Sequence, residues 1–135
     1  MARNARDAYF YSVGGAVHHG ESAEDAVRRE VAEETGVWME VDRLAFVHEN
    51  FFTESSATRD SSTRCHEICF YFLMRYLPQV PVRTGPRATG EPEWCEWVEL
   101  ESYGRDRPAF PTFFAAELND LTATPKWITT RQWTD

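Results

Sequence analysis

The sequence predicts a single α/β domain that spans residues 1–135. Two features of the chain predict this class: segments rich in β-branched and aromatic residues alternate with helix-forming segments, and no internal repeat or linker divides them. The length of 135 residues is that of about one domain. Hydrophobic residues make up 42% of the chain, as in ordinary globular proteins.

The first part of the chain predicts a strand, a tight turn and a helix. Tyr9–Val13 is aromatic and β-branched and ends at a Gly-Gly pair, which predicts a strand followed by a turn. Ser22 is a favourable N-cap for a helix. No Gly or Pro follows until Gly36, which is placed to end the helix as a left-handed C-cap. We therefore expect a helix over Ala23–Thr35.

The rest of the chain predicts further strands and a second helix. Leu44–Phe52 and Cys65–Leu77 predict strands, and the second, apolar on both faces, is expected at the centre of a sheet. Thr53–Arg64 is rich in Ser and Thr and is expected to be a loop, as is the proline-rich Pro78–Pro92. A short strand, a helix and an edge strand are then expected over Glu93–Leu100, Pro111–Asn119 and Trp127–Trp133.

Charge and composition exclude several classes of protein. Fourteen Lys and Arg against 22 Asp and Glu give a net charge of −8, whereas a general nucleic-acid binder usually carries the opposite charge. The longest apolar run, Ile68–Met74, has seven residues, far fewer than the ~20 of a membrane span. Three cysteines cannot all pair within the chain. We therefore expect a cytoplasmic protein with neither a nucleic-acid nor a membrane partner.

The predicted helix directs carboxylates toward its own apolar face. At about 100° per residue, Glu30 and Glu34 fall on the stripe formed by Ala26 and Val31, and Glu33 falls at its margin. Burying bare carboxylates is very costly. A hard cation such as Mg²⁺ resolves the conflict because it takes oxygen ligands from carboxylates, water and substrate phosphates. The direction of these carboxylates does not by itself exclude the alternative, which is a charged helix exposed to solvent.

A longer motif includes this helix. Residues 15–37 match the pattern G-x5-E-x7-R-E-U-x-E-E-x-G-U, where U is aliphatic, at all nine defined positions. This pattern is the Nudix box, and the chain therefore resembles the Nudix hydrolase superfamily. The resemblance implies a mixed β-sheet between helices, an α/β (α+β) fold. It also implies a pyrophosphohydrolase that cleaves the phosphoanhydride of a nucleoside diphosphate linked to another group.

The resemblance implies a role for each acidic residue of the helix. Glu30, Glu33 and Glu34 resemble the carboxylates that hold Mg²⁺ or Mn²⁺, and Glu33 is also the candidate general base within the box. Arg29 resembles the arginine that orients one of these carboxylates, and its i,i+4 spacing to Glu33 allows an ion pair. The implied nucleophile is a metal-activated water.

Substrate-binding residues are expected before the helix and at the end of a strand. Gly15 resembles the box glycine, which lets the loop turn and approach the site closely. Glu21 resembles the loop glutamate, which stabilises the loop or contacts metal indirectly. Phe51 lies at a strand end, where an aromatic ring could stack on a base. Packing in the core is the alternative use of this ring.

A glutamate outside the box is the second candidate for the general base, since many family members use one. Glu91, Glu93 and Glu96 precede Trp97 in a region that resembles the family's strand before its second helix. We select Glu93 from the three. The alternative is that all three are surface charges.

The sequence leaves alternatives open for both the function and the substrate. A nucleotide sensor without catalytic activity could use the same fold, but such proteins usually lose box carboxylates, and this chain retains all of them. Two stretches, residues 49–52 and 66–74, resemble proteins labelled ADP-ribose pyrophosphatase-like, a label too broad to define a substrate. ADP-ribose, other nucleotide sugars, dinucleoside polyphosphates and nucleoside triphosphates all stay open as nucleotide-derived substrates.

The segment before the box is shorter than the family's usual strand hairpin. Only 14 residues precede Gly15, and we expect Tyr9–Val13 to be the only strand among them, so that the sheet lacks that hairpin. The strand around Ile68–Met74 would then expose apolar surface, which favours association. Either the start lies further upstream or a second chain covers the gap, and we expect a homodimer.

Overall fold

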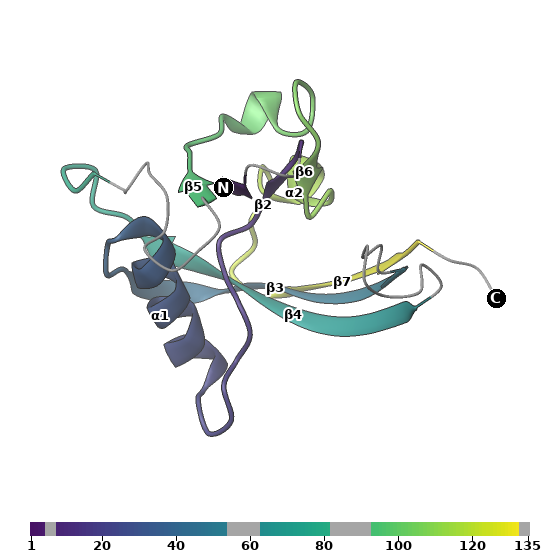
Figure 1. Cartoon of the computed structure of the whole chain (residues 1–135), viewed down its shortest axis with the longest axis horizontal. Coiled ribbons are helices and arrows are strands. Elements are labelled where there is room, and N and C mark those ends of the chain that lie inside the picture. Colours follow the sequence, from purple (N-terminus) through teal and green to yellow (C-terminus); the bar gives the residue numbers. More distant parts are fainter. Residues whose placement is uncertain (5–7, 54–62, 82–92, 133–135) are drawn as a thin grey trace. The chain divides into compact units, whose positions relative to one another are not determined.

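The computed structural model describes residues 1–4, 8–53, 63–81 and 93–132 (Figure 1). The elements in chain order are β1 (Ala2–Asn4), β2 (Phe10–Tyr11), α1 (Ala23–Thr35), β3 (Glu40–Thr53), β4 (Arg64–Arg75), β5 (Glu93–Cys95), the 3₁₀ helix η1 (Leu100–Ser102), β6 (Ala109–Phe110), α2 (Phe114–Glu117) and β7 (Lys126–Arg131). They form two sheets with few helices, which confirms the predicted α+β class.

The chain divides into two compact units. Unit 1 comprises Met1–Val41 and Met74–Leu121, and unit 2 comprises Asp42–Leu73 and Thr122–Asp135. Unit 1 contains the four-stranded sheet, and unit 2 contains the three-stranded sheet except for the first two residues of β3 and the last two of β4. The single domain predicted over residues 1–135 stays a prediction. None of the described helices is long and apolar enough to cross a membrane.

The sheet of unit 1 has the strand order β5-β1-β2-β6. β1 pairs antiparallel with both β2 and β5, and β2 pairs parallel with β6. The prediction that Tyr9–Val13 is the only strand before Gly15 is therefore wrong. β1 has the sequence Ala-Arg-Asn, which carries no alternating apolar pattern, so its pairing depends on neighbours that are distant in sequence.

Helix α1 has the predicted bounds, Ala23–Thr35. The Ser22 hydroxyl accepts a hydrogen bond from the Asp25 backbone N–H at 3.1 Å. Gly36 ends the helix with a left-handed φ of 74°, and its N–H donates to the Ala32 carbonyl. The buried face of α1 packs Val31 into a cluster with Val37 and Met39, and each such side chain contributes about 1.5–3 kcal/mol on burial.

The sheet of unit 2 has the order β4-β3-β7, with β7 parallel to β3. The prediction that the strand within Cys65–Leu77 is central is wrong, because β4 lies at the edge, and β3 is its only neighbour in the described part of the chain. The apolar surface expected around Ile68–Met74 is present, with Ile68 52% and Phe70 47% exposed. β7 occupies the other edge, as expected, over Lys126–Arg131.

Some predicted bounds differ from the structure. β5 ends at Cys95, and residues 100–102 form a 3₁₀ turn instead of continuing the strand expected to Leu100. The second helix spans Phe114–Glu117 rather than Pro111–Asn119, and its N-cap residue makes no side-chain capping bond. The two predicted loops lie largely outside the described residues, at 54–62 and 82–92.

Candidate active site

The box carboxylates occupy different positions on helix α1. Glu30 and Glu34 are buried, in common with Ala26 and Val31, so the facing predicted from the helical period is confirmed for them. One oxygen of Glu34, Oε2, is shielded from solvent. Glu33 lies at the margin, with its side chain 54% exposed. The helix therefore presents two inward carboxylates one turn apart and a third toward solvent.

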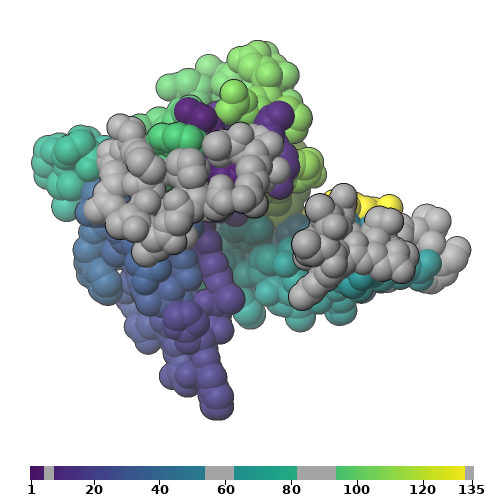
Figure 2. All heavy atoms as spheres, viewed as in Figure 1, coloured from purple at the N-terminus to yellow at the C-terminus, as the bar shows by residue number. Residues whose placement is uncertain are grey.

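Gly15 lies directly against the carboxylate of Glu30. A Cβ added at this glycine would overlap the carboxyl group of Glu30. Its backbone is outside the left-handed region, which in this loop is used by Gly14 and Gly20. The requirement for glycine at this position is therefore one of space. Figure 2 shows the loop that leads into α1 at the surface of unit 1, where residues 14–20 are exposed.

Arg29 connects this loop to the helix. Its Nε and Nη2 donate to the two carboxylate oxygens of Glu21 at 2.8 and 2.9 Å, and Nη2 also donates to the Ala16 carbonyl at 3.2 Å. Its Nη1 donates to Glu30 at 2.6 Å. The Arg29–Glu33 pair expected from the spacing is present but longer, at 3.6 Å. Arg29 thus binds most closely to Glu21 and Glu30.

The link from Arg29 to Glu21 was not anticipated from the sequence, although both residues occupy box positions. Hydrogen bonds from the Arg29 guanidinium, and then from the His18 backbone N–H, lower the pKa of Glu21 from 4.5 to about 2. Hydrogen bonds to Glu21 and then Glu30 raise the pKa of Arg29. Both partners are therefore charged at neutral pH, and the bidentate pair fixes the loop to α1.

Strand β5 carries the glutamate proposed from outside the box. Glu93 pairs with Asn4 in the register of β5 and β1. Two residues further on, the Cys95 thiol donates to the Glu34 carbonyl at 3.7 Å, so this strand lies next to the end of α1. Glu96 forms an ion pair with Arg3. Glu91 and the side chain of Glu93 lie outside what the structure describes.

Phe51 belongs to unit 2, whereas the box belongs to unit 1. Its ring stacks on His66 with centroids 4.1 Å apart and an interplanar angle of 14°. The Arg131 guanidinium lies 4.1 Å from the centroid of the same ring. The ring therefore contacts two cationic or ionisable neighbours on the unit 2 sheet.

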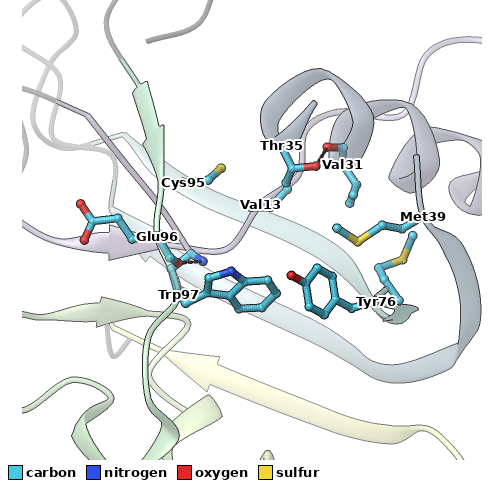
Figure 3. Close-up of a pocket in the computed structure, with 10 residues that line it drawn as sticks. Val13, Val31, Thr35, Met39, Tyr76, Cys95, Glu96 and Trp97 are labelled. Atoms are coloured by element: carbon cyan, nitrogen blue, oxygen red, sulfur yellow. Dashed lines mark hydrogen bonds between the residues drawn. The ribbon is translucent and has the colours of Figure 1, made fainter. Parts of the chain in front are cut away.

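A pocket of about 240 Å³ lies beside α1 in unit 1 (Figure 3). The residues that line it include Val31 and Thr35 of the helix, Met39, Tyr76 and Trp97. Neither Tyr76 nor Trp97 is expected from the sequence to be a site residue. Their one common signal is that they flank the proline-rich segment, and the fold brings the two rings together with centroids 4.7 Å apart.

Glu30 and Glu34 have the chemistry of a site for a hard divalent cation. Among the described residues, no three His, Cys, Asp or Glu side chains gather as a metal centre. Mg²⁺, however, is often held by only one or two carboxylates, with water and substrate phosphates completing its coordination. The two inward carboxylates fit such a cation. The close approach of the Gly15 backbone to the carboxylate of Glu30, which leaves no room for a Cβ, agrees with this.

The box residues that the structure brings together in unit 1 are Gly15, Glu21, Arg29 and Glu30, with Glu33 at the margin and Glu34 one turn along. A search of curated proteins finds no match for the chain. The family model of the NUDIX domain matches residues 2–116, well over half of the chain and the whole of the box. The chain therefore belongs to the Nudix family, whose members hydrolyse derivatives of nucleoside diphosphates.

Proposed function

We propose that this protein is a metal-dependent pyrophosphohydrolase that cleaves the phosphoanhydride of a nucleoside diphosphate linked to another group. The observation that carries the proposal is the complete box in its folded form. Arg29 binds loop Glu21 and helix Glu30 together, and Glu30 and Glu34 face inward. Sensors of the same fold usually lose box carboxylates, whereas this chain retains Glu30 and Glu34, both of them buried.

Glu30 and Glu34, with Glu33 at their margin, would hold Mg²⁺ or Mn²⁺. When bound, such an ion neutralises the diphosphate and lowers the pKa of a water molecule. The segment Gly14–Val37 contains six acids and two arginines, a net charge of −4. This charge would repel a bare diphosphate, so we expect substrate binding to depend on the divalent cation.

The remaining box residues position these groups. Arg29 orients Glu30 through its 2.6 Å hydrogen bond and, through Glu21, holds the Gly15 loop against the helix. In the reaction, a water oxygen bonds to one phosphorus while the bond from that phosphorus to the bridging oxygen breaks. A general base accepts the proton of the water. We assign this role to Glu93, with Glu33 as the alternative, and keep Phe51 as a candidate substrate contact.

A substrate panel tests this function. The full chain is incubated with ADP-ribose, nucleotide sugars, dinucleoside polyphosphates and nucleoside triphosphates, with Mg²⁺ and with EDTA. We expect turnover of at least one compound with Mg²⁺ and none with EDTA. Tight nucleotide binding without turnover of any compound would contradict hydrolysis and support a sensor. The same reaction in ¹⁸O-water identifies the phosphorus that is attacked.

We also propose that the protein forms a homodimer. Ile68 and Phe70, two residues apart, share one face of the edge strand β4 and are 52% and 47% exposed. Exposed apolar side chains on an edge strand favour association with another chain. Sedimentation is expected to give about twice the chain mass of 15.6 kDa. A monomer at all concentrations that still turns over substrate would contradict the dimer.

A further inference from the structure

We propose that the pocket beside α1 binds the planar aromatic group of the substrate, and that it recognises this group by shape and stacking rather than by hydrogen bonds. The proposal deepens the proposed function and rests on it, because it takes the substrate to be a nucleotide derivative. It predicts that the enzyme accepts different bases with similar affinity.

The pocket has the size and lining that a flat ring system requires. Its volume is about 240 Å³, whereas an apolar cavity of ~150 Å³ already takes benzene. Tyr76 and Trp97 lie against each other at an interplanar angle of 58° and together form an aromatic wall (Figure 3). Val31 and Met39 contribute apolar surface to the pocket. There is room for a fused bicyclic ring.

Three polar side chains that line the pocket, those of Thr35, Tyr76 and Cys95, already have hydrogen-bond partners within the protein. The Thr35 hydroxyl donates to the Val31 carbonyl at 2.6 Å, and the Tyr76 hydroxyl donates to the Val80 carbonyl at 3.2 Å. The Cys95 thiol donates to the Glu34 carbonyl. A ligand ring would have to break these bonds in order to be recognised through them.

Glu96 also offers little to a ligand in the pocket. Its carboxylate forms an ion pair with Arg3 and points away from the ring pair in Figure 3. We therefore infer that stacking on Tyr76 and Trp97 is the main interaction that the pocket offers to a ligand. It contributes about 1–3 kcal/mol per base and tolerates any base, because every base has a π-face.

The position of the pocket connects it to the carboxylates. Val31 and Thr35, which line the pocket, each follow an inward carboxylate by one residue, Glu30 and Glu34. The pocket and the carboxylates therefore occupy the same two turns of α1 on adjacent faces. A ring in the pocket would leave its phosphate tail on the carboxylate side of the helix. Trp97 is 65% exposed, and a bound ring would cover it.

Neutral nucleosides test the pocket without any hydrolysis. The ¹⁵N-labelled full chain, in EDTA, is titrated with adenosine, inosine, cytidine and ribose, and the indole N–H signals are followed by NMR. We expect the Trp97 signal to shift saturably with all three nucleosides, with dissociation constants within about fivefold of one another, and not with ribose. Trp97→Ala should weaken binding about 5–100-fold, as loss of one stack predicts, and Trp97→Phe should restore most of it.

Trp127→Ala is the matched control, since Trp127 is 62% exposed and lies on β7 of unit 2. It should leave nucleoside binding unchanged. Unaltered nucleoside binding by Trp97→Ala would contradict the proposal that this pocket is the binding site. A preference above about 30-fold for one nucleoside would contradict recognition by stacking alone. Glu34→Gln should bind adenosine normally. Nucleoside binding by a wild-type chain that hydrolyses nothing would contradict the proposed function and leave the pocket intact.

Discussion

The substitution Gly15→Ala tests why glycine is required at this position. It distinguishes a lack of space beside Glu30 from a need for glycine's backbone conformation. The new methyl group would overlap the carboxylate of Glu30, which is buried and receives a 2.6 Å hydrogen bond from Arg29. Because the backbone of Gly15 is outside the left-handed region, alanine adds no conformational strain. The carboxylate must therefore move, and its bond to Arg29 must weaken.

The magnitude follows from two opposing effects. Overpacking costs about 1–3 kcal/mol, and the reduced entropy of the unfolded chain returns about 0.4–1 kcal/mol. The midpoints of these two ranges differ by about 1.3 kcal/mol, and a loss of this size in the free energy of unfolding lowers Tm by about 3–8 °C. Displacing a ligand from its supporting contacts typically lowers metal affinity about 10–100-fold, and we expect this loss for Mn²⁺.

Gly20→Ala is the control in the same loop. Gly20 has a φ of 85° and nothing within 4 Å of an added Cβ, so alanine there costs about 1–2 kcal/mol of backbone strain and leaves Glu30 in place. Thermal unfolding gives the stability of both variants, and Mn²⁺ titration gives their affinity for the metal ion. We expect similar losses of stability but a loss of Mn²⁺ affinity only in Gly15→Ala. Equal Mn²⁺ affinities in the two variants would refute the reasoning.

Three further predictions concern charged groups. Arg29→Ala should lower kcat/KM about 10–100-fold, whereas Arg28→Ala, which removes ion pairs to exposed acids, should stay within about threefold; equal effects in the two would count against a positioning role. The pKa of Glu21 is lowered to about 2, so its contribution to stability is present above pH 4.5 and is lost as the pH falls toward 2. The Tm deficit of Glu21→Gln should narrow over that range, and a constant deficit would be inconsistent with the ion pair. Burial lowers the pKa of His48 from 6.5, so the unfolded chain binds the proton more readily and stability declines as the pH falls below 6.5. His48→Gln should therefore reduce the fall in Tm below pH 6.5. An unchanged dependence of Tm on pH would contradict the contribution assigned to His48.

Local signals accounted for the helix and for part of the site. The capping residues Ser22 and Gly36 and the helical period determine where α1 begins and ends and which carboxylates face inward, because these features depend on residues within a few positions of one another. The bidentate pair between Arg29 and Glu21 could not be obtained in this way. It depends on how the loop folds back on the helix.

Strand positions depended on contacts between distant residues. The apolar run of β4 predicts burial on both faces, but its edge position depends on which strands pair, and the sequence of β4 does not determine this. β1 is polar and short, and it is a strand because β2 and β5 pair with it. Tyr76 and Trp97 are likewise 21 positions apart, and only the fold of unit 1 brings their rings into contact.

Titration with Mn²⁺, followed by the loss of the free-ion EPR signal, tests most directly whether Glu30 and Glu34 hold a divalent cation. The full chain, Glu30→Gln and Glu34→Gln are compared with Glu24→Gln, which alters an exposed acid in the first turn of the same helix. We predict saturable binding by the wild type and by Glu24→Gln, with affinity at least about tenfold weaker in Glu30→Gln and Glu34→Gln. Wild-type Mn²⁺ affinity in both of these variants would contradict the assignment.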